Sequence, residues 1–186
     1  MKVTPTPLPG VLLVEPHVFA DERGYFFESY QEARYRSCGI AARFVQDNQS
    51  RSQRGVLRGL HYQLGRPQAK LVSVLQGEVF DVAVDVRKGS PTFGRWTGAL
   101  LSGENKHQLF IPEGFAHGFY VMSPTADFYY KCSDVYAREE ERGLVWDDPD
   151  VGIQWPPGPR ILAPRDAAFP RLRQMDADLP HYVPRP

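Results

Sequence analysis

Turn-forming residues interrupt the chain about every ten residues, and this spacing restricts its fold more than any other feature. Four such turns lie near the middle of the sequence, at 88–91, 102–105, 112–114 and 123–124. The segments between them contain many β-branched and aromatic residues, which favour strands. The pattern therefore predicts an all-β sandwich or barrel and argues against coiled coils and helical bundles, which need longer uninterrupted stretches.

The clearest strand pair surrounds a turn at Gly77. Lys70–Leu75 precedes this turn and Glu78–Arg87 follows it, and valines alternate with Asp81 and Asp85 in the second segment. Alternation with a period of two is typical of a strand. Further strands are expected at Gly10–Glu15, Gly24–Glu28, Phe44–Asn48, Val56–Gln63, Trp96–Leu101, His107–Ile111, Gly118–Met122 and Asp127–Ser133.

One short helix is expected at Gln31–Ser37. Ser29 is a candidate for its amino-terminal cap, and Gly39 lies just past its end, where glycine commonly terminates helices. The sequence shows no repeat, low-complexity tract or linker, so residues 1–186 are expected to form one domain. The segment of about 147–186 carries nine prolines, which prevent any long regular element, and we expect it to wrap the surface of the domain.

The balance of charge argues against binding to nucleic acid or anionic membranes through overall positive charge. The 22 lysines and arginines equal the 22 aspartates and glutamates, so no global basic field attracts nucleic acid or an anionic membrane. An anionic ligand must therefore be held by local cations. No apolar run approaches the ~18 residues of a membrane span. The two cysteines, Cys38 and Cys132, lack the spacing of a disulfide framework or a zinc site, which fits a reducing cytoplasm.

The strand expected at Val56–Gln63 carries two chemically versatile side chains, Arg58 and His61. They lie three positions apart, so strict alternation would direct them to opposite faces of the strand. Gly59 between them could host a bulge that brings both to one face. Taken alone, His61 is interpreted as a structural histidine and Arg58 as a solvated charge, so neither identifies a site unaided.

A second candidate is the turn with spacing P-x-G-x-x-H that ends at His117. This spacing resembles the second motif of the cupin superfamily. In metal-binding cupins that histidine is a ligand, and an earlier H-x-H pair with a carboxylate supplies the other ligands. The chain contains no H-x-H, and His61 is followed by tyrosine and glutamine, so we predict that no metal is bound.

Five blocks spread over almost the whole chain carry a resemblance to a known family. They are 21–30, 44–48, 56–63, 77–85 and 111–119, and two final blocks at 146–149 and 153–156 add to them. Together they are similar to the dTDP-4-dehydrorhamnose 3,5-epimerases, the dTDP-sugar isomerase family of the cupin superfamily. The resemblance implies an all-β fold, the cupin-type double-stranded β-helix or jelly-roll barrel, with a few short helices.

The resemblance also implies a reaction. It is the removal and return of protons at carbons 3 and 5 of dTDP-4-dehydro-6-deoxyglucose, beside the carbon 4 ketone, by an isomerase of dTDP-L-rhamnose biosynthesis that needs no cofactor. A proton next to a ketone is a very weak acid. The site must therefore supply a base on one face, stabilise the enolate oxygen and offer an acid on the other face.

Four residues at matching positions fit these catalytic roles. By the resemblance His61 is the base, and Asp166 pairs with it to fix its tautomer and to stabilise the imidazolium. Lys70 would lie near the enolate oxygen, and Tyr130 would return a proton to the opposite face. Taken alone, Lys70 and Asp166 would be interpreted as surface charges, so their value comes from joint occurrence.

A binding set for the nucleoside diphosphate follows in the same way. Arg23 and Arg58 match arginines that contact the diphosphate, because a guanidinium group can donate two parallel hydrogen bonds to phosphate oxygens. The other matching positions are Glu28, Gln46, Asp47, Asn48, His117, Tyr136, Glu141 and Arg165. Tyr136 is expected to stack on thymine. Since the family forms homodimers that exchange N-terminal strands, Arg23 and Glu28 are expected to serve the neighbouring subunit's site.

Three alternatives stay open. Many family members carry two adjacent tyrosines where this chain has Val135 and Tyr136, and relatives that epimerise only carbon 3 or only carbon 5 share the catalytic residues. A single epimerase of antibiotic-sugar biosynthesis is therefore the first alternative. A metal-dependent cupin oxygenase is suggested only by the turn that ends at His117. A dTDP-sugar binding protein without catalysis is disfavoured by the retained acid, base and orienting carboxylate.

Overall fold

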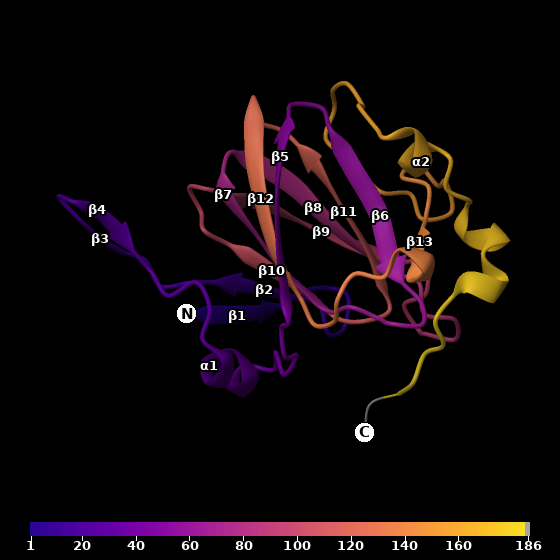
Figure 1. Ribbon diagram of the computed structural model, residues 1–186, viewed down its shortest axis with the longest axis horizontal. Coiled ribbons are helices and arrows are strands. Elements are labelled where there is room, and N and C mark those ends of the chain that lie inside the picture. Colours follow the sequence, from indigo (N-terminus) through magenta and orange to yellow (C-terminus); the bar gives the residue numbers. More distant parts are fainter. Residues whose placement is uncertain (185–186) are drawn as a thin grey trace.

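Two antiparallel sheets face each other in the computed structural model, which describes residues 1–184 (Figure 1). The larger sheet consists, in spatial order, of β1 (Lys2–Pro5), β2 (Leu12–Glu15), β10 (Gln108–Ile111), β7 (Lys70–Gln76), β12 (Thr125–Cys132) and β5 (Gln46–Gln53). The smaller sheet consists of β13 (Glu141–Gly143), β6 (Leu57–Gln63), β11 (Phe115–Val121), β8 (Glu78–Asp85) and β9 (Trp96–Ser102). This sandwich with a few short helices confirms the predicted all-β fold class.

The inner faces of the two sheets change from apolar to polar along the sandwich. The apolar part joins β7, β8, β10, β11 and β12 through the buried side chains of Val72, Val74, Val79, Ala83, Leu109, Ile111, Phe115, Phe119, Val121, Ala126 and Phe128. Every second residue of a strand points inward, so the same rows continue into Lys70 on β7, His117 on β11 and Tyr130 on β12. The polar end of the interior is therefore where a site can form.

The chain beyond β13 covers the outer face of the smaller sheet (Figure 1). It contains α2 (Pro164–Ala167) and the short 3-10 helices η2 (Leu172–Gln174) and η3 (Asp176–Asp178), and another such helix, η1 (Arg138–Glu140), precedes β13. Its buried apolar side chains pack against that face and are Val151, Leu172, Met175 and Leu179. β8 is consequently covered on both sides, with Val82 and Val84 facing this segment while Asp81 and Asp85 are buried in the interior.

The helix α1 (Glu32–Ser37) confirms the expected short helix, but its cap differs from the prediction. The side chain of Gln31, and not that of Ser29, accepts the hydrogen bond from the backbone N–H of Arg34. Ser29 instead uses its backbone carbonyl as an acceptor. The chain leaves the helix at Gly39, whose φ of 93° lies in the left-handed region that favours glycine. Within residues 1–184 no helix has the length and apolar character to cross a membrane.

A hairpin of β3 (Phe19–Asp21) and β4 (Gly24–Phe26) extends away from both sheets (Figure 1). We call residues 19–26 the arm. Every residue of its two strands is exposed, and Phe19 and Phe26 expose 59% and 70% of their surface. An isolated two-stranded hairpin with exposed aromatic rings gains little stability by itself and is typical of a surface that contacts a partner.

Candidate active site

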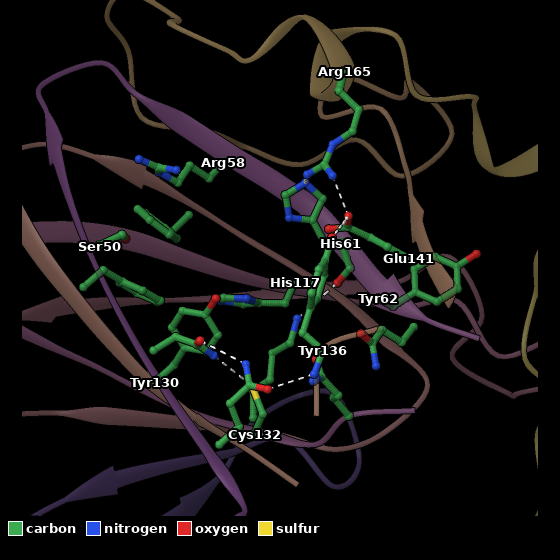
Figure 2. A pocket seen from close by; sticks show the side chains of 17 residues that line it. Ser50, Arg58, His61, Tyr62, His117, Tyr130, Cys132, Tyr136, Glu141 and Arg165 are labelled. Atoms are coloured by element: carbon green, nitrogen blue, oxygen red, sulfur yellow. Dashed lines mark hydrogen bonds and ion pairs between the residues drawn. The ribbon is translucent and has the colours of Figure 1, made fainter. Parts of the chain in front are cut away.

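A cavity of about 370 Å³ lies at the polar end of the interior (Figure 2). Its walls come from β5, β6, β7 with the residues just before it, β11, β12, the segment between β12 and α2, and α2 itself. The predicted site residues that line it are Gln46, Asn48, Arg58, His61, Lys70, His117, Tyr130, Tyr136, Glu141 and Arg165. The lining residues that sequence reasoning missed are Ser50, Tyr62, Gln63, Gln68, Phe119, Phe128 and Cys132. Strand alternation beyond Gln46 and Asn48 could have found Ser50.

β6 brings Arg58 and His61 to the same cavity although an odd spacing separates them. The pairing of β6 with β11 shifts its register at this point, and Gly59 has a φ of 114°, in the region that favours glycine. A Cβ on Gly59 would lie only 2.6 Å from Cα of Gly118 on β11, so the two backbones approach too closely for a side chain. The predicted bulge at Gly59 is confirmed, and it places the cation and the imidazole in one site.

His61 forms a close pair with Asp166, which α2 carries. Nε2 of His61 lies 2.9 Å from Oδ1 of Asp166, and the backbone N–H of Gly59 donates to Oδ2 at 3.1 Å. Burial by itself raises the pKa of Asp166, but the hydrogen bonds from His61 and Gly59 outweigh burial and hold that pKa below its ordinary value. The ionised carboxylate favours the tautomer with the proton on Nε2, which leaves the lone pair of Nδ1 for a substrate.

Lys70 and Tyr130 supply two more hydrogen-bond donor groups to the cavity. Burial lowers the pKa of Lys70, whose Nζ lies 3.5 Å from the backbone carbonyl oxygen of His61. Burial raises the pKa of Tyr130 to about 12, so its hydroxyl keeps its proton at neutral pH. Tyr130 comes from the larger sheet and His61 from the smaller sheet. A base and a proton donor therefore occupy opposite walls of one cavity.

A second pair of histidine and aspartate lies on the cavity floor. Nε2 of His117 is 2.9 Å from Oδ2 of Asp81, and the imidazole stacks on Phe128 with ring centroids 5.9 Å apart. Among residues 1–184, Oδ1 of Asp81 has no hydrogen-bond partner. Burial raises the pKa of Asp81 and lowers that of His117. Asp81 was not among the predicted site residues, because the sequence shows it only as a polar residue that alternates with the valines of β8, whereas the structure buries both sides of this strand.

Arg165 lies at the rim of the cavity between Glu141 and His61 (Figure 2). Its Nη1 donates to Oε2 of Glu141 at 2.5 Å, and the hydroxyl of Tyr136 donates to the same oxygen at 2.8 Å. Its Nε lies 3.4 Å from Oδ1 of Asp166. Half of the Tyr136 surface is exposed, so its ring is open to a flat ligand group at the rim.

The structure does not bring Asp47 to the cavity. Asp47 lies on the opposite side of β5 from Gln46 and Asn48, because neighbouring residues of a strand alternate. There its carboxylate pairs with Nζ of Lys131 at 2.9 Å and accepts a hydrogen bond from the hydroxyl of Tyr129 at 2.8 Å. Its position supports a role in the surface of the larger sheet rather than in the cavity.

Arg23 and Glu28 also lie away from this cavity. Arg23 lies at the turn of the arm, where its guanidinium pairs with Asp21 at 2.5 Å. Glu28 lies between the arm and α1 and pairs with Arg34 at 3.2 Å. Neither residue lines the cavity of its own subunit.

The described part of the chain contains no cluster of side chains suited to bind a metal ion. Among residues 1–184 no group of three or more His, Cys, Asp or Glu side chains is placed to hold a metal ion. His61 and His117 each use Nε2 toward a single carboxylate, so they belong to two separate pairs.

Comparisons with known proteins agree with this geometry. A family model described as dTDP-4-dehydrorhamnose 3,5-epimerase matches residues 5–174. A curated relative of the same name from Pseudomonas aeruginosa is 60% identical over 157 residues, which cover 84% of this chain and 87% of the relative. A crystal structure of a dTDP-6-deoxy-D-glucose-3,5-epimerase from Legionella pneumophila, in complex with dTDP-4-keto-L-rhamnose, is 56% identical with a TM-score of 0.96. That match covers 98% of this chain and 99% of the Legionella chain.

A relative of narrower activity has the same fold. The crystal structure of a 3′-monoepimerase from Streptomyces bikiniensis, in complex with dTDP-quinovose, is 34% identical with a TM-score of 0.90 and covers 96% of this chain and 92% of its own. The matches confirm the resemblance inferred from the sequence and the cupin-type β fold that it implied. The chain belongs to the dTDP-4-dehydrorhamnose 3,5-epimerase family.

Proposed function

We propose that this protein is an isomerase that converts dTDP-4-dehydro-6-deoxy-D-glucose to dTDP-4-dehydro-L-rhamnose by inverting carbons 3 and 5. The observation that carries the proposal is the placement of His61 and Tyr130 on opposite walls of one cavity. Inversion next to a ketone requires a base on one face of the carbon and an acid on the other. The similarity to curated 3,5-epimerases supports the same reaction.

The proposed step begins at His61. Its Nδ1 takes the proton from the carbon beside the ketone. The electron pair of that C–H bond forms a double bond to carbon 4, and the π electron pair of the ketone moves to the carbon 4 oxygen. The Asp166 carboxylate stabilises the imidazolium that forms. Lys70 stabilises the enolate oxygen as its charge develops.

Tyr130 completes the inversion from the other wall. Its hydroxyl gives a proton to the opposite face of the carbon, and the enolate electron pair returns to restore the ketone. His61 then releases its proton and the Tyr130 phenolate regains one from water before the second carbon reacts. The cycle consumes no cofactor, because every proton that leaves is replaced from solvent.

The chain has no net positive charge, so individual arginines must supply the positive charge that binds the nucleoside diphosphate. Arg58 and Arg165 line the cavity and offer guanidinium groups to the diphosphate oxygens. The exposed ring of Tyr136 is placed to stack on thymine, and Gln46 and Asn48 offer amide groups from β5. Relatives in complex with dTDP-sugars support this class of ligand for the cavity.

The proposal includes a cytoplasmic homodimer that exchanges its arms. The exposed aromatic rings of Phe19 and Phe26 favour burial against a second copy of the chain. The same exchange would carry Arg23 and Glu28 to the neighbouring cavity, which they do not reach in their own subunit. A reducing compartment fits the free thiols of Cys38 and Cys132.

The test is proton NMR of dTDP-4-dehydro-6-deoxyglucose in deuterated water with the protein and a downstream ketoreductase. We expect deuterium at both carbons and dTDP-L-rhamnose as product. In the matched His61→Ala variant we expect deuterium uptake to be lost while affinity for dTDP stays within a few-fold of wild type, because the nucleotide contacts are intact. Retained exchange in this variant would exclude His61 as the base.

A single epimerase is the second candidate, and the likeness to a 3′-monoepimerase favours keeping it. The same spectra distinguish it from the double epimerase. Label and inversion at one carbon only would establish the narrower reaction and overturn the proposal of two inversions. Absence of exchange at both carbons would overturn epimerase activity altogether.

A further inference from the structure

Gly143 lies directly opposite His61 in the pairing of β13 with β6. The ring of Phe169 occupies the space that a side chain at this position would need, since a Cβ on Gly143 would overlap three atoms of that ring. The φ of Gly143 lies outside the left-handed region, so the backbone itself would accept alanine. Glycine is therefore required here by the seat of Phe169 and not by the backbone conformation.

Phe169 contacts the imidazole from this seat. Its ring meets that of His61 at nearly a right angle, with centroids 5.6 Å apart and planes inclined by 78°. Phe169 follows α2 by two residues, so the segment that delivers Asp166 to the imidazole also delivers this ring. The backbone N–H of Val145 donates to the carbonyl of Pro170 at 3.0 Å and holds the next residue in place.

Polar contacts at one nitrogen do not fix the plane of an imidazole. Nε2 of His61 lies 2.9 Å from Oδ1 of Asp166 and 3.4 Å from Nη2 of Arg165, so both contacts are made at this one atom. Nε2 of His61 can keep its bond to Asp166 while the ring rotates about its long axis, and that rotation turns the Nδ1 lone pair away from a bound sugar. A perpendicular aromatic neighbour restricts this rotation, because edge-to-face packing is lost when the ring turns. Proton transfer depends on the direction of the lone pair, so a small rotation has a large effect on rate.

We propose that Phe169, seated on Gly143, is a positioning residue that holds the plane of the His61 imidazole with Nδ1 directed into the cavity. The inference rests on the proposed function, in which His61 is the base. It assigns to Gly143 the role of leaving room for the ring. Neither residue is assigned a contact with the reacting carbons.

The test is a double-variant cycle of Gly143→Ala, Phe169→Ala and the combination, with kcat and KM for the dTDP-sugar. Each single variant is expected to lower kcat about tenfold to a hundredfold with little change in KM, as for other residues that orient a reacting group. In the combination the added methyl no longer meets a ring, so kcat should equal that of Phe169→Ala alone. Additive losses would overturn the proposed seat.

Two further measurements separate positioning from general stability. NMR relaxation of the 13C–H groups of the His61 imidazole should show a rigid ring plane in wild type and a larger rotation of the ring in Phe169→Ala, while the tautomer stays the same in both because Asp166 still pairs with Nε2. Phe169→Leu keeps bulk for folding and should recover only part of kcat. The control Leu172→Ala removes a buried side chain of the same segment that contacts the outer core, so it should lower the melting temperature without lowering kcat.

The outcomes also distinguish this inference from the proposed function. An active wild type whose Phe169→Ala variant keeps both kcat and a rigid imidazole plane overturns the positioning role alone. A folded wild type that exchanges no deuterium at either carbon overturns the proposed function, and the positioning role with it.

Discussion

Tyr130 has its proton secured by its surroundings, since burial raises its pKa to about 12. In Tyr130→Phe the base on the other wall is intact, but no donor remains to protonate the opposite face. We expect formation of inverted product to fall by roughly 10²- to 10⁴-fold, the range for loss of a general acid. His61 can still return a proton to the face from which it took one, so deuterium should enter with retained configuration. NMR of the recovered sugar measures both, and inverted product at the wild-type rate would contradict the assignment.

The charge of Asp81 is expected to affect the pKa of Lys70 and, through it, the pH dependence of activity. Burial lowers the pKa of Lys70, and the nearby Asp81 carboxylate opposes that effect by stabilising the ammonium group. Asp81→Asn removes a negative charge, which makes protonation of Lys70 less favourable, so the pKa of Lys70 falls further. If the ammonium form of Lys70 stabilises the enolate, activity must then be lost at a lower pH on the alkaline side. We expect this limb of the kcat profile to move to lower pH, with kcat about tenfold lower.

The control for this prediction is a substitution in the His61–Asp166 pair. Asp166→Asn removes the orienting carboxylate of His61 and should lower kcat across the whole pH range, because the tautomer and the imidazolium lose their partner. An alkaline limb that stays in place in Asp81→Asn would show that Lys70 does not depend on this carboxylate.

At the scale of elements, the bulge of β6 is the device on which the site depends. Gly59→Ala forces a Cβ into the backbone of β11 and into an unfavourable φ, so we expect the free energy of unfolding to fall by about 2–3 kcal/mol. Gly89 is a matched control, with a φ of 86° and open space around its Cβ position. Gly89→Ala should cost only the backbone part, about 1 kcal/mol. Urea unfolding of the two variants measures the difference, and equal losses would contradict the close approach of β6 and β11.

The same elements show how far sequence reasoning reaches. Strands with alternating apolar residues, such as β8, were predictable because one period describes them. β5 was predicted only in part, since its polar sequence carries no apolar alternation and it is a strand because β12 pairs with it along its whole length. β1 and β13 are too short for any periodic signal. Pairing across the sheet, rather than local preference, determines such strands.

The site also contains some features that the sequence could predict and others that it could not. Spacing alone could suggest the bulge at Gly59, because the need to bring Arg58 and His61 together is visible in the sequence. The approach of Asp166 to His61 spans more than half the chain, so only the family resemblance could predict it. The contact of Phe169 with His61 and the pairing of Asp81 with His117 depend on register and on burial of both faces of a strand, which no local pattern contains.

At the scale of the whole molecule, one subunit does not bring all the proposed site residues to its own cavity. The arm extends away from both sheets (Figure 1). It carries exposed aromatic rings and Arg23, while the cavity of the same subunit supplies the proposed base, acid and remaining cations. If arms are exchanged, one chain supplies the catalytic residues of each cavity and the other chain supplies part of the nucleotide contacts. An association of this kind couples assembly with activity.

Complementation between two impaired chains tests this arrangement. Arg23→Ala removes a proposed diphosphate contact from the arm, and His61→Ala removes the base from the cavity. Each homodimer should be nearly inactive at low substrate concentration. In a mixed dimer the Arg23→Ala chain keeps its own His61 and receives an intact arm from its partner, so one of the two cavities is complete.

Statistical mixing makes half of the dimers hybrid, so coexpression of the two chains should restore about a quarter of the wild-type kcat/KM. If Arg23 acted within its own chain, no cavity of the hybrid would hold both residues and no activity would return. A chain carrying both substitutions, coexpressed with wild type, is the control. With exchanged arms, one cavity of its hybrids lacks His61 and the other lacks Arg23, so only the wild-type homodimers, about a quarter of the dimers, stay active. Without exchange one cavity of each hybrid would be intact, and about half of the activity would remain. Recovery in the first mixture at low dTDP-sugar concentration therefore reports that the two chains share each site, because only an exchanged arm can join an intact Arg23 to an intact His61.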